Sequence, residues 1–135
     1  MASIPRPDER SEGRERALYL LYEAHSKGIT PVEALELQVF EPDELTQTLV
    51  RGVADQRDRL DAVIEQRATG WTLKRMPVID LNVLRIGAFE LAERNDVPTA
   101  VVLDEAVKLV KQFSTDDSGR FVNGVLAAMV PDLRD

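Results

Sequence analysis

The sequence predicts an all-α protein, a single-domain helical bundle of about seven helices. Apolar residues recur at spacings of three and four along most of the chain, which is the periodicity of amphipathic helices. No stretch of useful length alternates apolar and polar residues as a strand would, and the segments between the periodic stretches are short. With 135 residues, 44% apolar and 30% charged, the chain is long enough for one domain with a hydrophobic core.

The N-terminal part is expected to contain an arm and one helix. Residues 1–10 carry two prolines and no periodicity, so we expect a flexible N-terminal arm followed by an all-α domain over residues 11–135. The first helix is expected over residues 11–27, and Gly28 is placed to end it.

Two further helices are expected before residue 70. Thr30 and Pro31 suit the N-cap and the first position of a short helix that runs to about residue 39. Pro42 and Asp43 then begin a long amphipathic helix that ends before Gly70.

The C-terminal part is expected to hold the remaining helices. One turn is expected over residues 72–76, and Pro77 restarts a helix that lasts to about residue 94. The stripe over residues 98–113 is too broad for a surface helix and predicts a central helix covered on most sides. The last helix is expected over residues 116–130, with Asp116 or Asp117 as its N-cap.

Three glycines lie inside predicted helices, at positions 52, 87 and 124. A glycine inside a helix costs about 1 kcal/mol relative to alanine. Close approach of a neighbouring helix is the expected compensation at each of the three.

Composition limits the classes of function. The formal net charge of −7 is opposite to the basic footprint of a protein that binds nucleic acid alone, so RNA binding would need a local cationic patch and a partner. The chain has no cysteine, no apolar run of membrane-spanning length and no secretory N-terminus. We therefore expect a cytoplasmic location and no membrane partner.

The sequence offers little for catalysis. His25 is the one histidine, there is no cysteine, and the glycine spacing fits neither a P-loop nor a dinucleotide fingerprint, so we expect no catalytic residue, metal or cofactor. Asp80 and Asp104 stand out because each lies in an apolar stretch. An ion pair with an arginine such as Arg85 is favoured over a functional role. The sequence does not indicate an enzyme.

Two groups of residues could form a binding surface. Arg10, Arg14, Leu18 and Tyr22 follow at intervals of four, as one line along a helix, and combine cations with a ring as a surface for phosphates and bases does. The second group surrounds the turn between the last two helices and comprises Lys111, Arg120 and Phe121. On residue types alone, ordinary helix edges are the favoured explanation of both groups.

Three segments resemble the NusB family of transcription antitermination factors. Residues 114–126, STDDSGRFVNGVL, are similar to its C-terminal signature. Residues 14–24 (RERALYLLYEA) and 84–91 (LRIGAFEL) match in the same order, and so do residues 96–98 and 104–106. The resemblance covers nearly the whole chain.

The resemblance implies a helical domain that binds boxA-type single-stranded RNA with NusE, a small-subunit ribosomal protein, in the RNA polymerase antitermination complex that supports ribosomal RNA transcription. It places RNA binding at Arg10 and Arg14, and at a second surface around the last turn. It also places Tyr22 and Asp80 at the partner. The second RNA surface comprises Lys111, Phe113, Asp117, Arg120 and Phe121.

The sequence departs from the family in its arm, where acids dilute the expected arginine cluster between Arg10 and Arg14. We therefore expect weak RNA binding by the chain alone. A protein–protein module that has lost RNA binding stays possible, as does a homodimer. A third alternative is the NusB-like accessory domain of RNA cytosine methyltransferases. The sequence ends at Asp135 without a cofactor-binding domain, which we take as an argument against this alternative.

Overall fold

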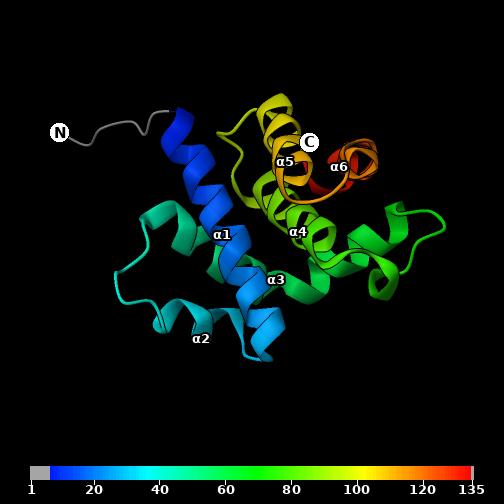
Figure 1. The fold of residues 1–135 in the computed structure, drawn as a ribbon. Helices are drawn as coiled ribbons and strands as arrows, with labels where there is room; N and C mark the ends of the chain where they lie inside the picture. The colour runs from blue at the N-terminus through cyan, green and yellow to red at the C-terminus, as the bar shows by residue number, and fades with distance from the viewer. Residues whose placement is uncertain (1–6, 135) are drawn as a thin grey trace.

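The computed structural model describes residues 7–134, which form helices and contain no strand (Figure 1). The prediction of an all-α domain is therefore confirmed, with six α-helices and one 3-10 helix in this part of the chain. The elements are α1 (Pro7–Lys27), α2 (Pro31–Glu36), α3 (Glu44–Arg67), η1 (Leu73–Arg75), α4 (Val78–Glu93), α5 (Thr99–Phe113) and α6 (Asp116–Leu133). None of the helices in residues 7–134 is long and apolar enough to span a membrane.

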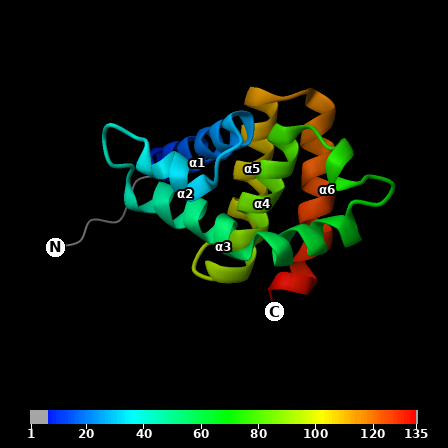
Figure 2. The ribbon, with the colours of Figure 1, turned by 90° about the horizontal axis from the view of Figure 1, so that it is seen from below.

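The helices pack around α4, which contacts α1, α3, α5 and α6. Helices α5 and α6 form an antiparallel hairpin joined by a short turn, and α1, α2 and α3 pack together on another side of α4 (Figure 2). The α2–α3 connection and the segment around η1 lie at opposite ends of the molecule in this view.

The expectation of a central helix over residues 98–113 is wrong, because α4 is the central helix. Every residue from Asn82 to Leu91 is buried. Helix α5 buries only one face, and Val101 at its start is 36% exposed. The apolar stripe of α5 is broad because valines also occupy the edges of the buried face. Apolar content alone does not distinguish such a helix from one that is buried on all sides.

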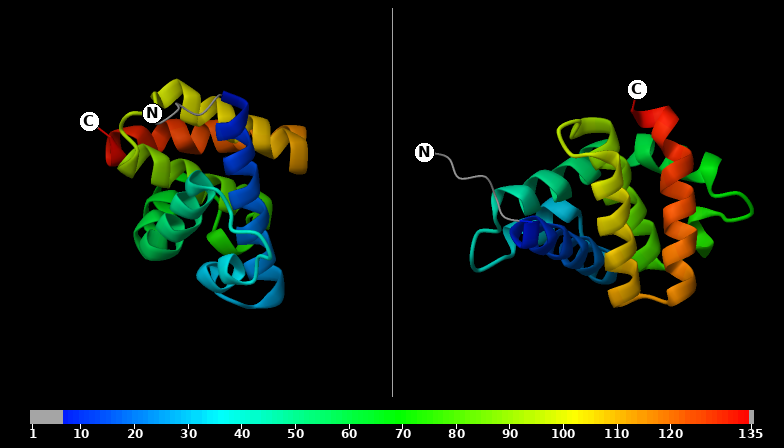
Figure 3. Two further views of the ribbon diagram at one scale, coloured as in Figure 1. Left: turned by 90° about the vertical axis from the view of Figure 1, so that its left-hand side faces the viewer. Right: turned by 90° about the horizontal axis from the view of Figure 1, so that it is seen from above.

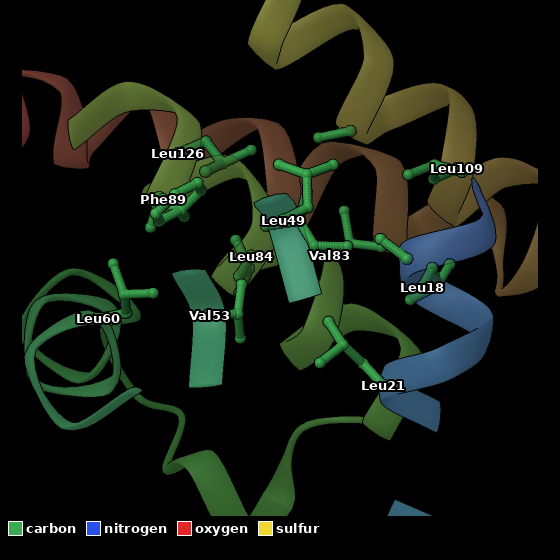
Figure 4. Close-up of a cluster of buried hydrophobic side chains, with 14 of the residues drawn as sticks. Leu18, Leu21, Leu49, Val53, Leu60, Val83, Leu84, Phe89, Leu109 and Leu126 are labelled. Atoms are coloured by element: carbon green, nitrogen blue, oxygen red, sulfur yellow. The ribbon is translucent and has the colours of Figure 1, made fainter. Parts of the chain in front are cut away.

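Large apolar side chains from all six α-helices form the core, and Figure 4 shows some of those from α1, α3, α4, α5 and α6. Leu18 and Leu49 enter from α1 and α3, and Leu126 enters from α6. At Gly52 an added Cβ would lie 2.2 Å from the Phe89 ring, so glycine allows α3 and α4 to approach.

Close approach also holds at Gly87, where an added Cβ would lie 2.8 Å from Leu126. The same expectation at Gly124 is wrong, since nothing lies within 4 Å of an added Cβ there.

Several boundaries differ from expectation. Helix α1 begins at Pro7, so residues 7–10 of the expected arm are helical, while residues 1–6 lie outside the described residues. A proline is well suited to the first position of a helix, because its missing N–H has no intrahelical partner there. Helix α2 ends at Glu36, three residues earlier than expected.

The N-caps of α3 and α6 are set by side-chain oxygens. Asp43 caps α3 as expected and accepts a hydrogen bond from the Thr46 amide at 2.7 Å. Thr115 caps α6 and accepts from the Ser118 amide, so the expected cap at Asp116 or Asp117 is wrong. Both aspartates instead lie in the first turn, where negative charge suits the helix dipole.

Candidate functional site

Arg14 does not lie on the surface. Its side chain is 2% exposed and donates from Nε and Nη2 to the two carboxylate oxygens of Glu90 on α4, at 2.7 and 2.9 Å. Burial opposes the charge of the guanidinium, but hydrogen bonding to Glu90 and the charges of Glu90 and Glu105 outweigh it, so the pKa of Arg14 is raised. Arg14 thus joins α1 to α4, and phosphate cannot reach it in this conformation.

The predicted line along α1 is therefore broken. Leu18 is 1% exposed and belongs to the core, whereas Arg10 is half-buried and Tyr22 is 45% exposed. Residues four apart drift around a helix, so a line drawn at this interval does not stay on one edge of a helix packed on two sides. Of the α1 residues predicted to bind, Arg10 and Tyr22 are accessible.

The α5–α6 turn has a polar hollow on one flank, which we call the Lys111 hollow. Lys111 and Arg120 are both exposed and line it, so the structure brings these two predicted cations together. The acids Asp104 and Asp116 also line it, and Asp117 lies 3.9 Å from the Arg120 guanidinium. The cations are accessible, but their field is partly cancelled by acids nearby.

A second hollow, the Trp71 hollow, lies between the start of α6 and the segment that joins α3 to α4. It has a volume of about 350 Å³, enough for an inserted side chain or base, and is lined by Trp71, Pro77, Asp80, Thr115, Asp117, Ser118 and Phe121. The rings of Trp71 and Phe121 are 5.6 Å apart and inclined at 57°. Trp71 is 47% exposed, so an aromatic wall faces solvent here.

Asp80 lies at the bottom of the Trp71 hollow. Its side chain is buried, and Oδ2 accepts a hydrogen bond from the Ser118 hydroxyl at 2.7 Å. Oδ1 is buried without a hydrogen-bond partner among the described residues. A buried acceptor left unpaired costs about 1–3 kcal/mol, so a donor that enters the hollow gains that much from pairing with it.

The expected ion pair of Asp80 with Arg85 is wrong. Arg85 instead binds Asp61 on α3, with Nε and Nη2 donating at 2.7 and 2.9 Å. Residues five apart on a helix are rotated away from each other, so Asp80 points toward α6 and Arg85 toward α3. Asp104, the other acid in an apolar stretch, is exposed.

A second aromatic pair borders the same turn. The rings of Tyr19 on α1 and Phe113 on α5 meet edge to face, with centroids 5.3 Å apart. Tyr19 is 50% exposed, while Phe113 packs partly against the core. The right-hand view in Figure 3 shows α5 and α6 side by side, joined by their short turn at one end of the hairpin.

The structure therefore brings Lys111, Arg120, Phe113 and Phe121 to one turn, and adds Asp80 beneath it. Neither hollow is lined by a described residue of α1, so neither of them joins the two predicted RNA surfaces. Sequence reasoning missed two exposed aromatics, Tyr19 and Trp71. The position of Trp71 directly after Gly70, at the end of a long helix, was the available signal, because a large ring seldom follows a helix stop without a contact to make.

The chain is similar to known proteins over most of its length. The model of the NusB family matches residues 11–131. A transcription antitermination protein NusB from Saccharopolyspora erythraea is 52% identical over 123 residues, covering 87% of this chain and 83% of that protein. The protein of the same name from Acidothermus cellulolyticus is 48% identical over 124 residues, with 89% and 86% covered.

Solved structures agree with these relatives. NusB of T. maritima superimposes with a TM-score of 0.84 and 27% identity, covering 98% of this chain and 96% of that one. A crystal structure of the antitermination factors NusB and NusE in complex with dsRNA superimposes with a TM-score of 0.79 and 25% identity, covering 94% and 99%.

Proposed function

Because the chain belongs to the NusB family, we propose that it is a transcription antitermination factor that binds boxA-type RNA together with NusE. It acts as a non-enzymatic adaptor in the antitermination complex of RNA polymerase, in the cytoplasm, and supports transcription of ribosomal RNA. The observation that carries the proposal is the Trp71 hollow, where Trp71 and Phe121 line the same space as Asp80, whose buried Oδ1 has no donor among the described residues.

We assign NusE to the Trp71 hollow. Oδ1 of Asp80 accepts a hydrogen bond from an amide, hydroxyl or cationic group of the partner, and Trp71 supplies apolar area beside it. A buried carboxylate that gains a charged donor forms one of the stronger hydrogen bonds in proteins. Tyr22, which is exposed on α1, is the second contact that we assign to the partner.

We assign RNA to the outer side of the turn. Lys111 and Arg120 contact phosphates at the Lys111 hollow. Phe113 at the end of α5 and Phe121, which also borders the NusE surface at the Trp71 hollow, provide ring surface for unpaired bases. Asp117 is exposed at the same turn and accepts hydrogen bonds from base donors. Arg10 contributes from α1, whereas Arg14 acts through the fold because Glu90 holds it inside.

The acids around these cations predict weak RNA binding by the chain alone. The net charge is −7, and Asp104 and Asp116 line the hollow that holds both cations. Phosphate contacts set both the affinity for RNA and its dependence on salt. A partner that holds the same strand beside the turn supplies the remaining contacts and raises the affinity of the pair.

The test measures binding of a boxA-type single strand, with and without NusE, at two salt concentrations. We expect tighter, salt-dependent binding with NusE, and a loss with Arg120→Glu that spares NusE binding. Arg51→Glu is the matched control, because Arg51 is exposed on α3 away from the turn. Salt-insensitive RNA affinity that is the same with and without NusE would refute the proposal. If NusE binds and RNA does not, the chain is a protein–protein module instead.

A further inference from the structure

A second exposed apolar surface lies far from the α5–α6 turn, on the connection between α2 and α3. Leu37, Val39 and Phe40 are 60%, 91% and 84% exposed, and they lie within four consecutive residues. We call residues 37–43 the Phe40 loop. Contiguous exposed apolar residues on a soluble domain mark an interaction surface more often than isolated ones do.

The Phe40 loop is held in place on both sides. Gln38 accepts a hydrogen bond from Arg16 at 2.9 Å and donates to Glu23 and to the Ala34 carbonyl. These bonds fix the start of the loop to α1 and α2.

The far side of the loop is anchored in the same way. Gln47 on α3 donates to the Pro42 carbonyl at 2.8 Å and to Glu41 at 3.3 Å. Val39 and Phe40 are thus displayed between two glutamine anchors. A loop fixed in advance loses less entropy when it binds.

The surroundings of the loop are acidic, since Glu33, Glu36, Glu41, Asp43 and Glu44 are all exposed. Two arginines lie nearby: Arg16, which is engaged by Gln38, and Arg51, which lines a hollow with Glu36 and Glu41. This charge repels RNA, and it opposes an isologous contact between two copies, in which each patch would face its own like charge. It suits a positively charged protein surface.

The Phe40 loop is well separated from the Trp71 hollow. It precedes α3, whereas Trp71 follows the end of that helix, and Figure 2 shows the two segments at opposite ends. A helix of 24 residues is roughly 36 Å long. The loop and the Trp71 hollow are therefore accessible at the same time.

We propose that the Phe40 loop is a docking site for a basic protein surface that receives Phe40 in an apolar pocket. The lysines or arginines around that pocket pair with the acids that surround the loop. This site goes beyond the proposed function, because neither RNA nor NusE occupies it. It makes the chain a connector with a third partner on its far side.

The test uses the whole chain and a defined probe of this chemistry, a helical peptide with one leucine face and one lysine face. We expect the peptide to shift the amide resonances of residues 36–44, and Phe40→Ser to weaken binding roughly tenfold or more, as loss of one buried aromatic side chain implies. Val101→Ser is the matched control, because Val101 is also an exposed apolar residue but lies on α5. Because Phe40 is exposed, Phe40→Ser is expected to keep the melting temperature and NusE binding of the parent.

Three results would overturn the proposal. The first is equal peptide affinity for the parent and Phe40→Ser. The second is equal binding of a matched peptide with glutamate in place of lysine, which would remove the role of the acids. The third is a dimer in sedimentation that Phe40→Ser abolishes, which would make a second copy of the chain the occupant.

Discussion

Replacement of Arg14 by methionine separates a structural role from an RNA contact. In the structure the guanidinium forms two hydrogen bonds with Glu90, and both side chains are 2% exposed. Arg14→Met retains much of the aliphatic volume but leaves the Glu90 carboxylate buried without its partner. A buried charge that loses its partner costs far more than the hydrogen bonds themselves contribute.

The expected loss of stability is about 3–5 kcal/mol. For a domain of this length, such a loss lowers the melting temperature by roughly 10–18 °C. Circular dichroism during heating and urea unfolding both measure it. The double variant Arg14→Met/Glu90→Met removes both charges, and it should recover most of the lost stability, because apolar replacement of a buried pair is often neutral or stabilising.

RNA binding by the double variant distinguishes a structural role of Arg14 from a direct RNA contact. We expect the Arg14→Met/Glu90→Met protein to bind a boxA-type strand with NusE as the parent does. If Arg14→Met leaves the melting temperature unchanged and reduces RNA affinity instead, Arg14 is a surface contact for RNA and not a buried link between α1 and α4.

Three further predictions concern packing, charge and the C-terminus. Gly52→Ala places a Cβ against the Phe89 ring and should cost about 1–3 kcal/mol of unfolding free energy, and an unchanged urea midpoint would show that the ring moves freely. Hydrogen bonding to Arg67 lowers the pKa of Asp132, so this pair stabilises the fold above about pH 3.9 and loses its effect as the pH falls through the lower pKa of the folded state. Arg67→Gln should raise the titration midpoint of Asp132 in a carboxyl NMR titration. An unmoved midpoint would show that Arg67 does not lower this pKa. Arg134 donates to four backbone carbonyls around the end of α4 and the start of α5, so Arg134→Met should lower the melting temperature. If amide exchange in the α4–α5 connection of the variant is as slow as in the parent, these hydrogen bonds contribute nothing to stability.

The helices could be predicted from the sequence because their periodicity and their caps are local. Thr30, Pro31 and Asp43 mark helix starts where the structure has them, since a cap depends only on the next three residues. At the start of α6, the N-cap is Thr115 and not one of the two aspartates that follow it. This could not be predicted because it depends on the path of the turn, which tertiary packing sets.

The candidate site was only partly predictable, for a different reason. Lys111 and Arg120 meet because they flank one short turn, and such proximity can be read along the chain. The partner of Arg14 is 76 residues away, and Asp80 meets a serine 38 residues away, so their roles depend on how α4 lies against other helices. Its charge suggested that Arg14 lies on the surface, but in the fold the charge is buried and paired with Glu90.

Trp71 itself can report whether the Trp71 hollow receives NusE. It is the one tryptophan of the chain, so labelling with 5-fluorotryptophan gives a single fluorine resonance. We predict that this resonance shifts when NusE is added, and that Asp80→Leu reduces both the shift and the affinity for NusE. A resonance that stays in place while gel filtration shows the complex with NusE would put the partner elsewhere and contradict the account.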